Sequence, residues 1–427
     1  MFGMQIGRLG RVDGRLSDAQ KILALFKNGE QGFWLDPSDL STLFQDAAGT
    51  TPVTAVEQHV GLMLDLSGRG NHASMATTTK RPAYSRRVNL LTKTEQFDDA
   101  AVWARFSSGT GSSPTLTPGF IAPDGTNTAW RLQLNRGPGI SASDFSILRQ
   151  ATSDTQAKQR KVWIKSNTAE PQTLSLVATL SSDIVTAGLD WAQVTGGSNS
   201  AAVQLDFSNY GTVPTSQVVD VLIWHPEMVP VQDAHLPYQW VNTDTDYDAD
   251  PAKFPAYLRF DGVDDALQTG NIDFTGTDKM TVWAGVDRTP GSTTGVIVGT
   301  SGNAFYSDGA FALFAHGTLG YEFASRGTVL SDTVFNSSPP ASPSTVVASF
   351  DIGGSSVVHR VNSQQSAITA NQGTGQYGNY PLYIGALSTS SIYLNGRLYS
   401  LIVRGAQSSL SQIEATEAYV KQKMRLP

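Results

Sequence analysis

Four aspartates alternate along residues 242–251, where the sequence reads NTDTDYDADP. Ca²⁺ prefers clustered carboxylate oxygens, and an Asp-x-Asp-x-Asp start opens many calcium loops. An EF-hand is excluded, because Ala249 stands where that loop needs glycine and Pro255 where it needs glutamate. We favour a solvated acidic linker with no cofactor. The alternative is a calcium site formed by Asp244, Asp246, Asp248 and Asp250, with Asp261, Asp264 and Asp265 as helpers.

A tryptophan between two lysines is the candidate for sugar binding. In residues 161–165 (KVWIK), strand alternation would place Trp163 on the same face as Lys161 and Lys165, away from the two apolar neighbours. The other tryptophans mostly have the spacing of core residues, as Trp130 and Trp224 do. An exposed aromatic ring flanked by polar groups suits a pyranose, so these three residues are the candidate carbohydrate site. Contact with a neighbouring subunit is the alternative use of Trp163.

No arrangement of residues in the sequence indicates an enzyme. A nucleophile elbow G-x-S-x-G and a phosphate loop are both absent. The six histidines are scattered rather than spaced for a catalytic triad or for zinc, and we expect His72 to stabilise a turn in its glycine-rich loop. Glycoside hydrolysis needs a pair of carboxyl groups, and Glu322 stands alone. We therefore expect no catalytic activity.

Composition narrows the partners further. The chain has 427 residues, enough for two or three domains. Its formal net charge of -7 and its lack of a Lys/Arg-rich run argue against nucleic acid. The absence of cysteine excludes disulfides and thiolate zinc sites. No run of 18 apolar residues and no signal-peptide core occur, so we expect synthesis in a cytoplasm and no membrane insertion.

Short alternating apolar runs separated by turn signals predict a mostly β protein with two β-sandwich domains, a short N-terminal helical segment and a C-terminal helix. Ser17–Gln20 and Ser411–Glu414 are the expected capping boxes of the two helices. In the second helix, helical spacing places four apolar residues on one side: Leu410, Ile413, Val420 and Met424. The expected divisions are 1–59 (N-terminal segment), 60–88 (connector or first part of a sandwich), 89–241 (first sandwich), 242–256 (acidic linker) and 257–427 (second sandwich).

Three stretches of the sequence carry a family resemblance. They are residues 32–40 through 64–73 (GFWLDPSDL to LDLSGRGNHA), residues 89–97 with Trp103, and residues 257–265 (YLRFDGVDD). Together they resemble a family of phage and prophage virion structural proteins, which are tail-fibre, appendage or head-decoration components. Such proteins combine concanavalin A- or laminin G-like sandwiches with jelly rolls like those of carbohydrate-binding modules. The resemblance covers most of the chain.

The resemblance implies a non-catalytic structural component of a bacteriophage particle, located in the virion. Residues 1–59 would dock onto other virion proteins, and the sandwiches would provide subunit contacts and adhere to host-surface glycans. Homo-oligomers, often trimers, are expected of such parts. The first alternative is a dedicated receptor-binding lectin of a tail fibre. The second is a polysaccharide depolymerase, but the Glu-x-Asp-x-Glu triplet of the related glucanases is missing here.

The spacing of two motifs indicates an insertion. In proteins of this family the Asp-x-Ser-Gly-x-Gly-Asn-His element (residues 65–72) and the Phe-Asp-Gly-x-Asp-Asp element (residues 260–265) lie close together in sequence. Here about 185 residues separate the two stretches. We infer that residues 89–241, the part similar to a carbohydrate-binding-module jelly roll, are inserted into or ahead of a laminin G-like sandwich.

Overall fold

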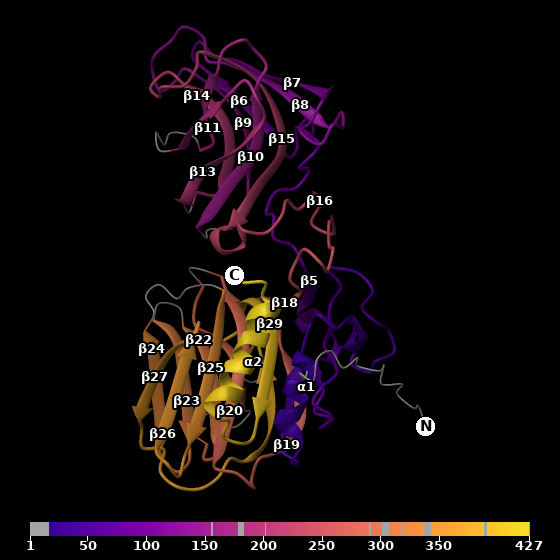
Figure 1. Cartoon of the computed structure of the whole chain (residues 1–427), viewed down its shortest axis with the longest axis vertical. Helices are drawn as coiled ribbons and strands as arrows, with labels where there is room; N and C mark the ends of the chain where they lie inside the picture. Colours follow the sequence, from indigo (N-terminus) through magenta and orange to yellow (C-terminus); the bar gives the residue numbers. More distant parts are fainter. Residues whose placement is uncertain are drawn as a thin grey trace. The chain divides into compact units, whose positions relative to one another are not determined.

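The chain folds into two units, each built mainly of β-strands (Figure 1). The computed structural model describes residues 17–154, 157–177, 183–200, 202–289, 292–300, 307–316, 319–336, 343–387 and 391–426. Unit 1 combines residues 1–86 with residues 255–427, and unit 2 comprises residues 87–254. The predicted fold class is confirmed: β-sheets predominate, with a short N-terminal helix and a C-terminal helix.

The first sheet of unit 1 has eight strands. They are β1 (Gly32–Leu35), β5 (Ala83–Ser85), β18 (Tyr257–Asp261), β20 (Lys279–Arg288), β25 (Ser344–Asp351), β26 (Ser356–Val361), β27 (Gln364–Thr369) and β29 (Asn395–Arg404). Their order is β27-β26-β25-β20-β29-β18-β5, and β1 also pairs with β29. All these pairs are antiparallel.

The second sheet of unit 1 has nine strands. They are β2 (Leu43–Phe44), β3 (Leu62–Met63), β4 (Ala73–Ser74), β19 (Leu267–Asp273), β21 (Gly295–Thr300), β22 (Ala310–His316), β23 (Gly320–Arg326), β24 (Leu330–Asn336) and β28 (Asn379–Ile384). Their order is β2-β3-β4-β19-β28-β21-β22-β23-β24. Short 3-10 turns, η2 (Leu40–Thr42) and η3 (Thr78–Lys80), lie between the early strands.

The main core of unit 1 contains apolar side chains from both sheets. In β20, alternate residues serve two different cores, because successive side chains of a strand point to opposite faces. Met280, Val282 and Ala284 belong to the main core, whereas Trp283 belongs to a separate core with the helices. This explains why β20 is apolar on both faces.

Two helices cover the outer face of the first sheet, where Figure 1 shows α1 in indigo and α2 in yellow. They are α1 (Asp18–Leu23), continued by η1 (Ala24–Phe26), and α2 (Leu410–Lys423). The capping box predicted at Ser17 and Gln20 is confirmed. The second capping box is formed by Ser409 and Gln412, two residues earlier than predicted. Among the described residues, no helix is long and apolar enough to cross a membrane.

Helix α2 packs closely on the sheet beneath it. Ile413, Val420 and Met424 are buried as predicted, but Leu410 is 54% exposed because it lies in the first turn beyond the packed surface. A Cβ atom on Gly285 of β20 would lie 2.9 Å from both Val420 and Met424. Glycine at 285 therefore permits the close approach of the helix.

The structure does not separate the N-terminal segment from the sandwich. We predicted residues 1–59 as a division of their own, but β1 pairs with β29, and Phe33 and Leu43 lie in the main core. The carboxylate of Asp36, after β1, accepts hydrogen bonds from the Tyr419 hydroxyl (2.6 Å) and the Lys423 ammonium (2.8 Å) of α2. Residues 17–59 thus complete unit 1 and are held by its C-terminal helix.

Unit 2 is bounded by two strands of unit 1 that pair with each other. Tyr257, the first residue of β18, is the register partner of Ser85, the last residue of β5. Residues 87–254 therefore leave and re-enter unit 1 at adjacent points of one strand pair. The boundaries lie two residues before the expected start at 89 and thirteen residues after the expected end at 241.

Unit 2 contains two five-stranded sheets and a hairpin. The strands are β6 (Ala104–Ser108), β7 (Ser112–Phe120), β8 (Ala129–Asn135), β9 (Phe145–Ala151), β10 (Lys158–Ser166), β11 (Gln172–Ser175), β12 (Ile184–Ala187), β13 (Ala192–Ser200), β14 (Gln204–Tyr210), β15 (Val218–Pro230), β16 (Val241–Thr243) and β17 (Asp246–Tyr247). The sheet orders are β13-β10-β15-β8-β7 and β12-β11-β14-β9-β6, with β16 paired to β17. A 3-10 turn, η5 (Val231–Asp233), follows β15.

The expected acidic linker is instead folded into unit 2. Residues 241–247 form the β16–β17 hairpin, and the backbone N–H of Thr94 donates to the carbonyl of Val241 (3.0 Å). Further along, Phe254 is fully buried with Val88 and Leu236. The polar composition of residues 242–256 suggested a linker, because the apolar residues that hold this segment in unit 2 are few and widely spaced.

Candidate functional site

Trp163 lies on the outer face of the sheet β13-β10-β15-β8-β7, the face turned away from the core of unit 2. Its strand neighbours Val162 and Ile164 are fully buried in that core, as the alternation predicted. Trp163 is partly exposed, and its register partners are Gln193 on β13 and Trp224 on β15. Trp163 meets Trp224 edge-on, with ring centroids 6.4 Å apart. The exposed or interface position predicted for Trp163 is therefore compatible with the fold.

A bulge in β15 organises the aromatic residues beside Trp163. Lys161 pairs with Glu227 and Trp163 with Trp224, so two residues of β15 face a single residue of β10. One of the two is His225, whose φ of +50° is unusual for a non-glycine residue. Bulges re-aim side chains, and here the His225 ring stacks on that of Trp224, with centroids 3.3 Å apart.

The stack continues to Tyr238, which lies against the other face of the His225 ring at 3.7 Å between centroids. The indole N–H of Trp224 donates to Thr128 (2.9 Å), and Trp224 is only 8% exposed. Burial raises the pKa of Tyr238 well above its usual value. Trp224 is thus fixed and covered, whereas Trp163 keeps an exposed part. Trp224 is buried, as its spacing predicts, but it belongs to a small cluster with Ala122 and Ala129 rather than to the main core of unit 2.

A polar row runs beside the aromatic residues on the same outer face. Cross-strand register aligns Lys165, Arg131 and Thr117 in this row, with the apolar Leu222 between Lys165 and Arg131. Arg131 donates two hydrogen bonds to the carboxylate of Asp220, at 2.8 and 2.5 Å. That carboxylate also accepts from the side-chain amides of Gln133 (3.3 Å) and Asn167 (3.1 Å). Sequence reasoning missed this network, because its members come from three separate segments.

The carboxylate of Asp220 is held in its charged form. Burial acts to raise its pKa, but the hydrogen bonds from Arg131, Asn167 and Gln133 outweigh burial, so the pKa lies below its usual value. Asp220 therefore fixes the guanidinium of Arg131 in place. The two hydrogen bonds to Asp220 use only two of the five N–H donors of Arg131, and the side chain is 32% exposed.

The two lysines predicted beside Trp163 differ in their surroundings. Lys161 is only 7% exposed; its ammonium forms an ion pair with Glu227 (2.7 Å) and donates to the carbonyl of Ala234 (3.2 Å). Lys161 is therefore a structural group, and its assignment to a sugar site is corrected. Lys165 is partly exposed and takes part in no ion pair within the described parts of the chain.

The four alternating aspartates do not form a common site. Asp244 pairs with Arg87, and Asp246 accepts from Asn242 (2.7 Å). Asp248 and Asp250 both lie near the ammonium of Lys253, at 2.9 and 3.6 Å. Within the described residues, these aspartates form no group of three whose ligand atoms lie close together. Asp244 and Asp246 have separate partners, and Asp248 and Asp250 share Lys253, so the predicted calcium ligands are not gathered.

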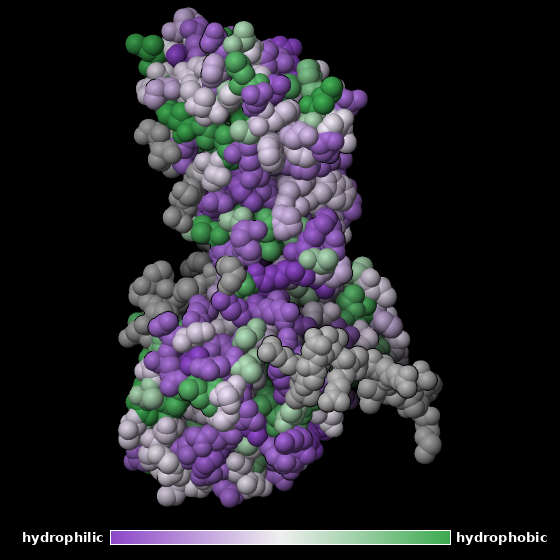
Figure 2. All heavy atoms as spheres, viewed as in Figure 1, coloured by the Kyte–Doolittle hydropathy of each residue, from purple (hydrophilic) through white to green (hydrophobic). Residues whose placement is uncertain are grey.

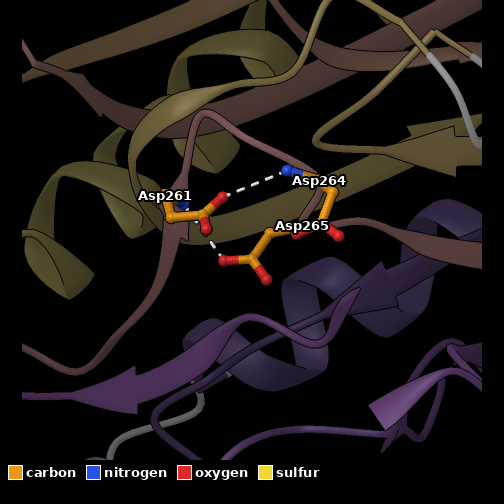
Figure 3. A group of neighbouring side chains, drawn as sticks. All are labelled: Asp261, Asp264 and Asp265. Atoms are coloured by element: carbon orange, nitrogen blue, oxygen red, sulfur yellow. Dashed lines mark hydrogen bonds between the residues drawn. The ribbon is translucent and has the colours of Figure 1, made fainter. Parts of the chain in front are cut away.

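Three other aspartates do come together, in the turn after β18 (Figure 3). Ligand oxygens of Asp261, Asp264 and Asp265 lie within 4.8 Å of one another. The carboxylate of Asp261 accepts from the backbone N–H of Val263 (2.8 Å) and Asp264 (3.3 Å), while that of Asp265 accepts from the N–H of Asp261 (3.1 Å). Among the described residues this is the group that could hold a cation, although turn hydrogen bonds already account for two of its carboxylates.

Asp265 is the electrostatically strained member of this group. It is 7% exposed, and burial together with the negative charges of Asp261 and Asp264 raises its pKa to about 6. A neutral Asp265 is therefore favoured in mildly acidic solution.

In the loop at residues 65–72, the carboxylate of Asp65 accepts four hydrogen bonds. One carboxylate oxygen of Asp65 accepts from the N–H of Trp34 (2.9 Å) and of Ser67 (2.8 Å). The other accepts from the Ser67 hydroxyl (2.8 Å) and the N–H of Asn71 (3.1 Å). His72 accepts from the N–H of Asp65 (2.9 Å), as expected of a residue that stabilises the turn. The motif therefore ties β1 to its neighbouring loop.

Glu322 does not stand alone in the folded protein. Its carboxyl hydrogen-bonds that of Asp332 on the adjacent strand β24, and burial together with Asp332 raises the pKa of Glu322 to about 7. The sequence could not show this pairing, because it depends on the β23–β24 register. Glycosidases hold their two carboxyl groups roughly 5 to 9.5 Å apart, so that the scissile bond lies between them. The carboxyl groups of Glu322 and Asp332 are in direct hydrogen-bond contact, so their arrangement differs from that of a glycosidase pair.

Comparisons with known proteins give structural matches only. No family model and no curated protein matches this chain. The CBM40 domain of the Ruminococcus gnavus IT-sialidase, bound to alpha2,3 sialyllactose, is 13% identical over 35% of this chain and 97% of its own (TM-score 0.28). Domain 4 of AbnA, an arabinanase from Geobacillus stearothermophilus in complex with arabinotriose, is 12% identical over 38% and 76% (TM-score 0.30). A SAP-like pentraxin from Limulus polyphemus is 9% identical over 38% and 80% (TM-score 0.31).

Proposed function

We propose that this chain is a non-catalytic carbohydrate-binding protein and that unit 2 binds glycans on the outer face of its sheet β13-β10-β15-β8-β7. The observation that carries the proposal is the position of Trp163, partly exposed on the outer face of the sheet and adjacent to a fixed polar row. A pyranose ring would stack on the indole. Its hydroxyl groups would accept from N–H groups of Arg131 that Asp220 leaves unused.

The surface of the protein suits recognition by stacking and hydrogen bonding. On the face shown in Figure 2, apolar residues form small patches separated by hydrophilic ones in each unit. The aromatic group beside Trp163 includes Phe120 and Trp191, both only partly buried. Partly exposed aromatic rings beside polar side chains offer a sugar both a stacking surface and hydrogen-bond partners.

We further propose that the protein serves in a bacteriophage particle, where residues in the N-terminal part contact other virion proteins and unit 2 adheres to host-surface glycans. The sequence stretches 32–73 and 257–265 support this setting by their resemblance to virion structural proteins. A homo-oligomer, such as a trimer, would multiply a weak sugar affinity. The second candidate function is a subunit contact made by Trp163, which the same partial exposure would serve.

A glycan array with the full chain tests the proposal. We expect binding that falls at least about fivefold in Trp163→Ala, because truncation of a central aromatic contact typically costs more than 1 kcal/mol. Phe106→Ala is the matched control: Phe106 is 43% exposed on β6, in the other sheet of unit 2, and its loss should leave binding unchanged. Thermal melting of both variants verifies that they are folded.

Three outcomes separate the candidate functions. Glycan binding that is lost in Trp163→Ala and kept in Phe106→Ala supports the lectin role. Binding to purified virion proteins alone, with no glycan bound, would replace it by the subunit contact. Release of reducing sugar from a host polysaccharide would contradict the non-catalytic assignment, and the variant Glu322→Gln would then show whether the carboxyl pair is responsible.

A further inference from the structure

Lys165 differs from the other charged residues on the outer face of the unit 2 sheet. Lys161 is neutralised by Glu227 (2.7 Å), and Arg131 by Asp220 (2.5 Å). Within the described residues Lys165 takes part in no ion pair, although it lies on the same face and is partly exposed. Among the described residues of the outer face, Lys165 is thus a cation that no carboxylate of the protein matches.

The position of Lys165 relative to Trp163 is fixed by β10. The two residues are separated by Ile164, whose side chain points into the core, so both project from the same face. Residues two apart on a strand are about 6.5 Å apart along it. An ammonium group at this spacing reaches the edge of a sugar whose ring rests on the indole.

We infer that the glycan site of unit 2 selects sugars that carry a carboxylate, with Lys165 binding the carboxylate while Trp163 stacks against the ring. This inference rests on the proposed function. Hexuronates and nonulosonates share the required group, a carboxylate attached to a pyranose. Arg131 lies in the same row, two strands away, but its pairing with Asp220 leaves it hydrogen-bonding capacity rather than net charge.

The apolar neighbour of Lys165 strengthens this assignment. Its register partner on β15 is Leu222, which is 8% exposed and offers no competing charge. Lysine commonly lays its methylene stem along such apolar surface and keeps the ammonium in water. A carboxylate bound there would form a charge-assisted hydrogen bond in partly screened surroundings. The expected preference for a charged over a neutral sugar is about fivefold to tenfold.

The test compares polymers that differ only in charge. The full chain is titrated by biolayer interferometry, at about physiological ionic strength, with polygalacturonate, with its carboxyl-reduced form, and with colominic acid as the nonulosonate source. We expect the wild type to bind a carboxylated polymer about fivefold to tenfold more tightly than the reduced one. Lys165→Gln should remove this difference. Arg105→Gln is the matched control, because it removes one exposed positive charge from β6, in the other sheet.

The outcomes for this inference and for the proposed function are distinct. If Lys165→Gln keeps the preference, or if the wild type binds the reduced polymer equally well, the inference is overturned. If the inference is overturned in this way but Trp163→Ala still abolishes binding to the polymers, the proposed function is kept. A preference that falls equally in Lys165→Gln and Arg105→Gln overturns the inference, since it reflects overall charge. Failure to bind either carboxylated polymer also overturns it, and the glycan array then decides the proposed function.

Discussion

The neutral imidazole of His359 provides the sharpest test of the unit 1 core. His359 on β26 is fully buried, and its ring stacks on Phe323 with centroids 4.2 Å apart. Its Nε2 lies 2.7 Å from the Thr333 hydroxyl, which itself donates to the carbonyl of Phe323 (3.2 Å). Nε2 thus has a hydrogen-bond partner in the neutral ring, and Nδ1 is the second ring nitrogen. That atom is buried without a hydrogen-bond partner in the described structure.

Protonation of this ring would bury a positive charge and an unmatched N–H donor. Burial accordingly lowers the pKa of His359 from 6.5 to about 4. The unfolded chain binds the proton below pH 6.5, but the folded chain does so only near pH 4. Unfolding therefore takes up a proton in this window, and stability falls as the pH decreases through it. The loss from pH 7 to pH 5 amounts to about 2 kcal/mol, and it approaches about 3.4 kcal/mol well below pH 4.

The variant His359→Gln isolates this contribution. Glutamine can keep a hydrogen bond with Thr333 but does not titrate. We expect the free energy of unfolding of unit 1 to fall by about 2 kcal/mol more in the wild type than in the variant when the pH is lowered from 7 to 5. Calorimetric melting at the two pH values measures the difference. The other titrating groups are common to both proteins and cancel.

Histidine NMR supplies an independent readout. Six histidines are present, and comparison with His359→Gln identifies the signal of His359. That signal should stay unchanged between pH 8 and about 5. A midpoint near pH 6.5, or an equal pH dependence of stability in the two proteins, would refute the reasoning that burial keeps the ring neutral.

Three further substitutions test other buried carboxylates, each measured by thermal or urea unfolding. The pKa of Asp265 is raised to about 6, so its ionised carboxylate destabilises the fold above that pH, and Asp265→Asn should stabilise unit 1 at pH 7.5 by up to about 3 kcal/mol. If Asp265→Asn instead lowers the stability of unit 1 in calcium-containing buffer, and a chelator abolishes this loss, the result would indicate a bound cation. Asp65→Asn should lower the free energy of unfolding by about 2–4 kcal/mol, because the NH2 group of the new amide would face two donors. Asp273→Asn, at an exposed turn, should lower it by less than about 1 kcal/mol. Glu417 is hydrogen-bonded to Thr345 and forms a buried ion pair with Arg360, so Glu417→Ala should lower the free energy of unfolding by about 3–5 kcal/mol. A decrease below about 1 kcal/mol would contradict the claim that the buried ion pair stabilises unit 1.

Sequence patterns predicted those features that depend on local alternation and capping. The mostly β class, the Ser17 capping box and the buried side of α2 follow from spacing along one segment. The outward position of Trp163 also follows, because its neighbours Val162 and Ile164 identify the inner face of the strand.

Pairings between distant segments lay beyond the reach of sequence patterns. Lys161 and Lys165 look equivalent in the sequence, yet only Lys161 meets a buried carboxylate, because the β15 bulge brings Glu227 opposite it. The Glu322–Asp332 contact likewise depends on strand register. The Asp244–Asp250 run shows the opposite error: residues close in sequence do not form one site, because Asp244 pairs with Arg87 while Asp248 and Asp250 lie at Lys253.

The split of unit 1 around unit 2 constrains the order of events during protein synthesis. Strand β1 pairs with β29, β4 with β19, and β5 with β18, so every one of these early strands waits for a partner beyond residue 254. At about 5–20 residues per second, a ribosome that has made residue 86 needs roughly 16–64 s to reach residue 404, the last residue of β29. During that time the apolar strand β1, whose residues are all buried in the finished fold, lacks its partner, while the whole of unit 2 can emerge and fold. Nascent chains of this protein are therefore expected to depend on chaperones at their N-terminal part until β29 has been made.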